Sequence, residues 1–112
     1  MNKCIAIPTE DRILCAHFGH CQHFAIISIK DSKMSDVDFV VPPPHEPGLL
    51  PAWLKEIGVT DVIAGGIGQK AINLFNGHDI NVFACAQAKS PKELAEDLIS
   101  GNLEAGSNYC DH

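Results

Sequence analysis

The chain has 112 residues, 46% of them hydrophobic, and a formal net charge of −6. This length and apolar content favour one folded domain with a single core. The excess of acidic residues argues against nucleic-acid and membrane partners. No segment approaches the roughly 20 apolar residues of a membrane helix. The N-terminal apolar run is too short for a signal peptide. We therefore expect one cytoplasmic domain over 1–112, with a globular core at 1–101 and a polar tail at 102–112.

Residues 3–8 form a short run that is apolar on both faces, as in a buried strand. No clear period marks 9–23, which we interpret as a loop with room for one helical turn. Residues 24–30 and 34–41 are predicted as two strands of an antiparallel hairpin, because only a short turn joins them. We expect the first strand to lie centrally, between this hairpin and the strands of the second half.

A proline-rich loop at 42–48 leads into the first predicted helix. The apolar stripe of that helix follows the i, i+3, i+4, i+7 spacing and comprises Leu50, Trp53, Leu54 and Ile57. Gly58 is placed to end it.

Strands and helices alternate in the remaining sequence. Strands are predicted at 61–64 and 80–84, with a helix over 67–75 between them, and a last helix runs from a capping box at 90–93 to Gly101. The order β-β-β-α-β-α-β-α follows. Because β-α-β crossovers join parallel strands, the sequence predicts an α/β fold with a mixed five-stranded sheet and helices on its faces.

Five cysteines are expected to be free thiols in a reducing cytoplasm. Cys4 and Cys85 lie inside apolar runs and are predicted to be buried and slow to react. Cys15, Cys21 and Cys110 lie among polar residues and histidines. We expect Cys15 and Cys21 to react quickly in the metal-free protein.

The stretch from Cys15 to His23 is the richest in potential metal ligands. It packs two thiols and three imidazoles into nine residues, and these groups bind iron, copper and zinc. The spacing matches no closed zinc motif. A mononuclear Zn, Fe or Cu site built from Cys15, His17, His20 and Cys21 is one interpretation, and a polar loop whose histidines bond to backbone is another.

Gly65-Gly66-Ile67-Gly68 lies between a predicted strand and a predicted helix. Glycines allow close approach of the backbone, and a helix N-terminus presents free N–H groups with partial positive charge. Such a turn can hold an anion, including the sulfides of a cluster, although a tight structural turn has the same residues. The tail adds Cys110 and His112 as further potential ligands, unless it is simply a frayed terminus.

Hydrolytic chemistry is not indicated. The acidic residues are scattered along the chain, whereas two-metal hydrolysis needs converging carboxylates. Cys21 with His17 or His20 as base would be the alternative of a Cys-dependent enzyme, but no orienting third residue can be named. We expect no catalysis.

Several motifs together resemble the dinitrogenase iron–molybdenum cofactor biosynthesis family. They are, in chain order, Ile5-Ala6-Ile7-Pro8-Thr9, His17-Phe18-Gly19 closed by Phe24, then His45, Pro47 and Gly48, then Val62-Ile63-Ala64-Gly65-Gly66-Ile67-Gly68, and Cys110-Asp111-His112. The resemblance implies a three-layer α/β/α fold with a ribonuclease-H-like motif. It also implies binding or carriage of an iron–sulfur or molybdenum-containing cluster, without nuclease activity.

Our leading hypothesis is therefore non-catalytic cluster binding or carriage, in cofactor assembly or metal homeostasis. The His17-Phe18-Gly19 loop and the turn at 65–68 would form two walls of one shallow site at the ends of the first and fourth strands, where ligands bind in open α/β sheets. Cluster donor and acceptor proteins would be the partners.

Overall fold

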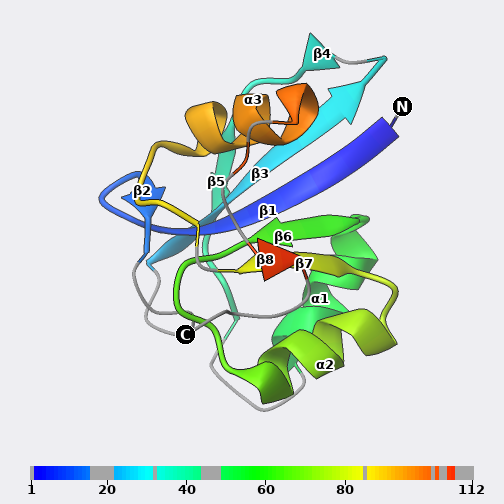
Figure 1. The fold of residues 1–112 in the computed structure, drawn as a ribbon. Coiled ribbons are helices and arrows are strands. Elements are labelled where there is room, and N and C mark those ends of the chain that lie inside the picture. The colour runs from blue at the N-terminus through cyan, green and yellow to red at the C-terminus, as the bar shows by residue number, and fades with distance from the viewer. Residues whose placement is uncertain are drawn as a thin grey trace.

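The computed structural model describes residues 2–15, 22–31, 33–43, 49–84, 86–101, 103 and 106–107. The elements run in the order β1 (Asn2–Glu10), β2 (Ile13–Leu14), β3 (His23–Lys30), β4 (Lys33–Met34), β5 (Asp38–Val40), α1 (Leu49–Ile57), β6 (Asp61–Ile63), α2 (Gln69–Gly77), β7 (Asn81–Ala84), α3 (Pro91–Ser100) and β8 (Gly106–Ser107). Figure 1 shows their arrangement. The α/β class predicted from the sequence is confirmed.

The described strands form one mixed sheet in the order β4-β3-β1-β6-β7-β8, with β2 added to β1 and β5 added to β3. β1 pairs with β3 in antiparallel register from Asn2↔Lys30 to Thr9↔His23. On its other side β1 runs parallel to β6, and β6 runs parallel to β7. The predicted central position of the first strand is confirmed.

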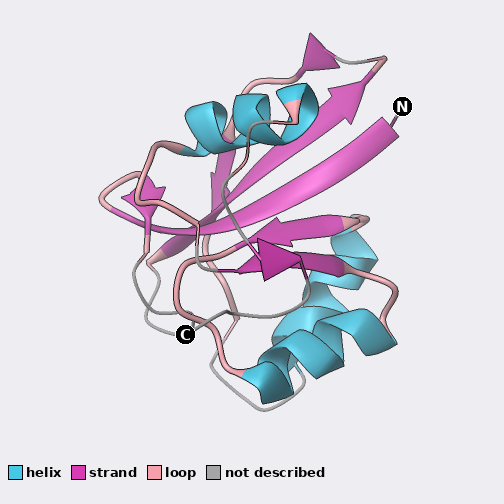
Figure 2. Cartoon of the chain, viewed as in Figure 1, coloured by secondary structure: helices cyan, strands magenta, loops and turns pink. Residues whose placement is uncertain are grey.

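Helices cover both faces of this sheet, α3 on one and α1 with α2 on the other (Figure 2). The core under α3 comprises Ile5, Ile7, Leu14, Ala25, Ile27, Ile29, Ile63, Leu94 and Ala95. The larger core under α1 and α2 includes Ala6, Phe24, Leu50, Leu54, Val62, Ile72, Phe75 and Val82. Neighbouring residues of β1 face opposite helices, which explains why 4–8 is apolar at every position. None of the described helices has the length and apolar content to span a membrane.

The predicted ends of α1 and α3 agree with the structure, whereas α2 covers Gln69–Gly77 and not 67–75 as predicted. Gly58 follows α1 with φ +104°, and Gly101 ends α3 with φ +81°. At the start of α3 the Ser90 hydroxyl accepts the Glu93 N–H at 3.3 Å. One detail of the α1 stripe is wrong, because Ile57 is 41% exposed at the last turn of the helix.

The loop predicted at 9–23 is wrong in its first half. β1 continues through Thr9 and Glu10, turns at Asp11 and Arg12, and pairs with β2. Both turn residues have positive φ, +54° and +65°, as a two-residue type I′ hairpin turn requires. Such turns prefer Asn-Gly, so Asp-Arg gave no hairpin signal.

Two further strand predictions need correction. The strand predicted at 34–41 is divided into β4 and β5, which pair separately with β3. The polar tail is not wholly outside the sheet, because β8 pairs with the end of β7 through Phe83↔Ser107 and Ala84↔Gly106.

The thiol environments also differ from those expected. Cys4 is half-buried, whereas Cys15 is buried with 3% exposure. The assumption that Cys15 is accessible is therefore wrong. Cys21, Cys85 and Cys110 lie outside the described residues.

Candidate functional site

The carboxyl ends of β1, β6 and β7 meet at one edge of the sheet, because these three strands are parallel. Figure 1 shows the turn after β6 and the segment from β7 to α3 leaving the sheet on the side where β1 turns into β2. The β1–β6 register pairs Ala6 with Val62, so continuing it by two residues places Pro8 level with Ala64, just before the glycine turn. We call this the carboxyl edge.

Both ends of the loop at 16–21 are tied to the carboxyl edge. The Cys15 N–H donates to the Pro8 carbonyl at 2.9 Å, and the Gln22 N–H donates to the Thr9 carbonyl at 2.9 Å. The buried Thr9 hydroxyl donates to the His23 carbonyl at 2.9 Å and fixes the strand that leaves the loop. Cys15 and Gln22, which flank residues 16–21, therefore both lie beside the end of β1.

The predicted ligands His17, His20 and Cys21, together with Phe18 and Gly19, lie in this loop and outside the described residues. The predicted tail ligands Cys110 and His112 lie outside them too. Of the six candidate metal ligands, the structure describes Cys15 alone. The structure therefore describes the two residues that flank this segment, Cys15 and Gln22.

The glycine turn follows β6 at the same edge. The Ala64 N–H donates to the Phe83 carbonyl at 2.9 Å, and the Ala64 carbonyl accepts the Ala86 N–H at 3.0 Å. Gly65 is buried, and Ile67 packs in the core under α1 and α2. The Ile67 side chain thus anchors the turn to the core.

Gly68 is the exposed N-cap residue of α2, with φ −75° and no side-chain cap. The first-turn N–H groups of α2 consequently have no side-chain partner from Gly68, and the positive end of the helix dipole faces the turn. Among the described glycines, positive φ occurs at Gly58 and Gly101. The glycines of the turn at 65–68 therefore do not serve a left-handed conformation.

A third segment, between β7 and α3, borders the carboxyl edge on the side of α3. The Leu14 N–H donates to the Lys89 carbonyl at 3.0 Å, which joins β2 to the segment between β7 and α3. Lys89 also pairs with Asp97 of α3 at 3.0 Å. The end of β2, from which the ligand-rich loop starts, is thus fixed on both sides.

Whether the described residues could hold a metal ion depends on how their His, Cys, Asp and Glu side chains are placed. No three His, Cys, Asp or Glu side chains gather to hold an ion within that part of the chain. A site ligated by three or more such side chains would therefore need at least one donor from outside the described residues, such as those at 16–21 or in the C-terminal tail. Thiolate and imidazole are suitable donors for iron, copper and zinc.

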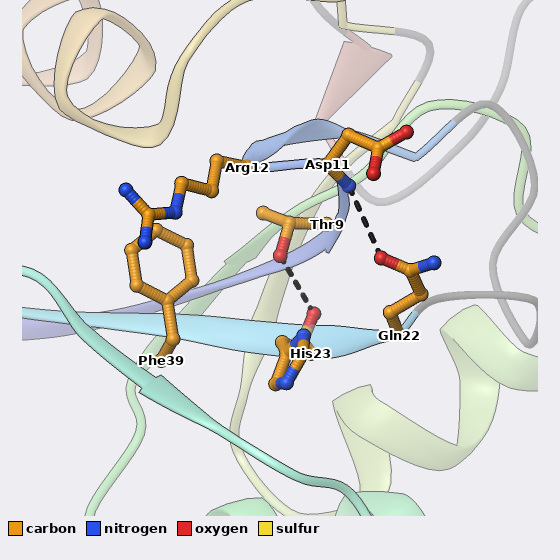
Figure 3. A pocket seen from close by; sticks show the side chains of 6 residues that line it. All are labelled: Thr9, Asp11, Arg12, Gln22, His23 and Phe39. Carbon is orange, nitrogen blue, oxygen red and sulfur yellow. Dashed lines mark hydrogen bonds between the residues drawn. The ribbon is translucent and has the colours of Figure 1, made fainter.

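A pocket that was not predicted from the sequence lies beside Thr9 and Gln22. Its volume is about 280 Å³, and it is lined by Thr9, Asp11, Arg12, Gln22, His23 and Phe39 (Figure 3). The Arg12 guanidinium lies 5.7 Å from the centre of the Phe39 ring. The one signal was His23 at the end of the ligand-rich stretch. Arg12 and Phe39 come together only through the pairing of β1 with β2 and of β3 with β5.

The opposite edge of the sheet carries a buried polar group with a structural role. Asp61 is 1% exposed; it accepts hydrogen bonds from Thr60 at 2.6 Å and Asn81 at 3.4 Å, and lies 3.6 Å from the Lys3 ammonium. Burial raises the pKa of the nearby Cys4 thiol, a hydrogen bond with Ser28 lowers it, and the Asp61 charge raises it further. Cys4 is consequently a poor thiolate donor at neutral pH.

These features define a small α/β domain with a potential ligand loop and a glycine turn anchored at one sheet edge. Residues 1–101 match the family described as dinitrogenase iron-molybdenum cofactor, and the chain belongs to this family. Family membership and fold fit a role related to a metal cluster.

The chain is also similar to one further protein and to two solved structures. The chain is 30% identical over 105 residues to the uncharacterized protein MJ0580 of Methanocaldococcus jannaschii, covering 89% of this chain and 88% of that protein. The crystal structure of PH0822 superposes with a TM-score of 0.82 at 30% identity, covering 91% and 93% of the two chains. The apo form of the orange protein from Desulfovibrio gigas has a TM-score of 0.75 at 17% identity, covering 93% and 92%, and shares the fold.

Proposed function

We propose that the protein binds or carries an iron–sulfur or molybdenum-containing cluster at the carboxyl edge and catalyses no reaction itself. One observation carries the proposal: the paired hydrogen bonds from Cys15 to Pro8 and from Gln22 to Thr9, which fix both ends of a loop rich in thiol and imidazole. These bonds hold Cys15 and Gln22 beside the end of β1, and fixing the ends of a binding segment lowers the entropic cost of ligand binding.

The glycine turn supplies the second wall of the proposed site. Backbone N–H groups at Gly65 and Gly66, and those of the first turn of α2, would donate to cluster sulfides without adding a charged side chain. In a chain with net charge −6, such neutral donors and the helix dipole would favour an anionic cluster locally. His17, His20 and Cys21 would contribute direct ligands, with Cys110 and His112 as further candidates.

A cargo role implies that other proteins deliver and remove the cluster. We infer a place in cofactor assembly or metal homeostasis, with donor and acceptor proteins as partners. The buried Cys15 would stabilise the start of the loop, and only the loop itself would exchange ligands.

Anaerobic purification followed by elemental analysis, acid-labile sulfide assay and absorption spectroscopy tests this proposal. A bound cluster gives iron or molybdenum with stoichiometric labile sulfide and sulfide-to-metal charge-transfer bands. Zinc without sulfide would instead identify a mononuclear site. Protein that stays metal-free after reconstitution with iron and sulfide, and with thiomolybdate and copper, would contradict the proposal.

A further inference from the structure

Arg12 is oriented by both its backbone and its side chain. It is the second residue of the β1–β2 turn and has φ +65°, a conformation that glycine adopts with less strain. Its guanidinium lies over the Phe39 ring at 5.7 Å (Figure 3). A charged side chain kept in a strained turn and stacked on an aromatic ring is the arrangement expected of a functional contact.

The Arg12 charge is not neutralised within the described part of the chain. The ion pairs there join Lys3 to Asp61 and Lys89 to Asp97. In Figure 3 the carboxylate of the neighbouring Asp11 points away from the guanidinium. The planar edge of Arg12 is therefore available to a carboxylate from outside, the group that guanidinium binds in bidentate fashion.

Exposed apolar side chains flank this cation. Phe39, which stacks against the guanidinium, is 39% exposed, and Val41 is 72% exposed. Phe39 and Val41 are two residues apart in the chain and lie on the same side of an extended segment. Aromatic residues and arginine are the types enriched at protein interfaces. We call Arg12, Phe39 and Val41 the docking face.

The docking face adjoins the carboxyl edge. Thr9 and Gln22 line the pocket beneath Arg12, and the same two residues join the loop at 16–21 to the sheet. A protein bound at the docking face would consequently lie next to the proposed cargo. This continuity favours an exchange partner over a free metabolite as the occupant.

We propose that a cluster donor or acceptor protein binds the docking face and places one carboxylate side chain, flanked by apolar side chains, against Arg12. This inference rests on the proposed function. Glu10, Asp11 and Asp38 are exposed around the face and would repel an extended acidic patch. The partner segment is therefore mainly apolar, with a single acidic residue.

The test uses ¹⁵N-labelled, metal-free protein and two acetylated, amidated tripeptides, Leu-Glu-Leu and Leu-Gln-Leu, with butyrate as a free acid. We expect shifts at Arg12, Gln22 and Phe39, and roughly fivefold tighter binding of the Glu peptide than of the Gln peptide. Arg12→Ala abolishes that preference. Lys33→Ala removes an exposed cation at β4 and serves as the matched control that keeps it.

Equal binding of the two peptides by the wild type would overturn the inference. Butyrate that binds as tightly as the Glu peptide would also overturn it, because it would indicate a site for free acids.

Arg12→Gly separates function from folding. It should melt at the same or a higher temperature than the wild type, because the turn strain is relieved, and lose the preference. Retained preference in Arg12→Gly would overturn the inference. Cluster loading of the wild type, measured separately, shows whether the proposed function fails as well.

Discussion

The Cys15 backbone N–H donates to the Pro8 carbonyl at 2.9 Å, so that the chain contacts β1 directly after β2. Gln22 makes the equivalent bond to Thr9 on the far side of the loop. Two adjacent residues of one strand thus hold both ends of the segment with most of the predicted ligands. Changes at these anchors should alter the loop more than the rest of the fold.

Thr9→Val is expected to loosen the exit of the loop. The buried Thr9 hydroxyl donates to the His23 carbonyl, and valine fills the same space without a donor. We expect the free energy of unfolding to fall by about 1 kcal/mol, and amide exchange at Gln22 to accelerate. Urea denaturation and hydrogen exchange measure these effects. Thr9→Ser keeps the hydroxyl and should exchange at Gln22 as slowly as the wild type; equally fast exchange in both variants would contradict this role of the bond.

Cys4 and Cys15 are both expected to react slowly with iodoacetamide in the native, metal-free protein. Burial shields Cys15, and burial raises the pKa of the Cys4 thiol so that little thiolate forms at neutral pH. Labelling of Cys4 should therefore begin at higher pH than that of a free cysteine. Peptide mass spectrometry after timed labelling gives the rates, with urea-unfolded protein as the control. Native Cys15 that labels as fast as in urea would show that this thiol is accessible.

Asp61→Ala is expected to destabilise the fold by about 1–3 kcal/mol, because it removes a hydrogen-bonded carboxylate that is itself 1% exposed. Thr60 and Asn81 would lose their acceptor, and Lys3 its counter-ion. Asp38→Ala, at an exposed position in β5, is the matched control and should change stability by less than about 0.5 kcal/mol. Urea denaturation compares the two variants; similar small losses would mean that the Asp61 contacts contribute little.

Gly68→Ala is expected to fold as well as the wild type. Gly68 has φ −75°, and a Cβ there would meet no atom within 4 Å. Gly101→Ala is the contrasting variant, because φ +81° at the end of α3 should cost about 1 kcal/mol with a side chain present. Thermal unfolding distinguishes them. A Gly68→Ala variant as unstable as Gly101→Ala would mean that Gly68 is required for folding rather than for access to the backbone.

The sequence predicted those helices and strands whose local residue pattern agrees with their surroundings in the folded protein. Every position of 4–8 is apolar because β1 is covered on both faces, and Ser90 and Gly101 bound α3 through their own capping geometry. The β1–β2 hairpin escaped prediction because Asp11 and Arg12 adopt positive φ without the usual glycine or asparagine. The pairing of β8 with β7 joins segments far apart in the chain, so no local pattern marks it.

The candidate site was predictable in part for a similar reason. The turn after β6 was identified from its glycines, and its position opposite the end of β1 followed from parallel pairing. The pocket under Arg12 was not identified, since Phe39 approaches Arg12 only when β5 adds to β3. The burial of Cys15 was also missed, because β2 carries this thiol into the sheet beside Leu14.

The most direct test of the central claim is anaerobic titration of wild type, His17→Ala and Gly66→Val with iron and sulfide, followed by absorption. His17→Ala removes a proposed ligand, and Gly66→Val blocks approach to the turn, so each should weaken cluster binding by roughly tenfold or more. His78→Ala, at the end of α2, and Gly77→Ala are the matched controls and should bind like the wild type. If His17→Ala and Gly66→Val stay folded and also bind like the wild type, the loop and the glycine turn do not share one cluster.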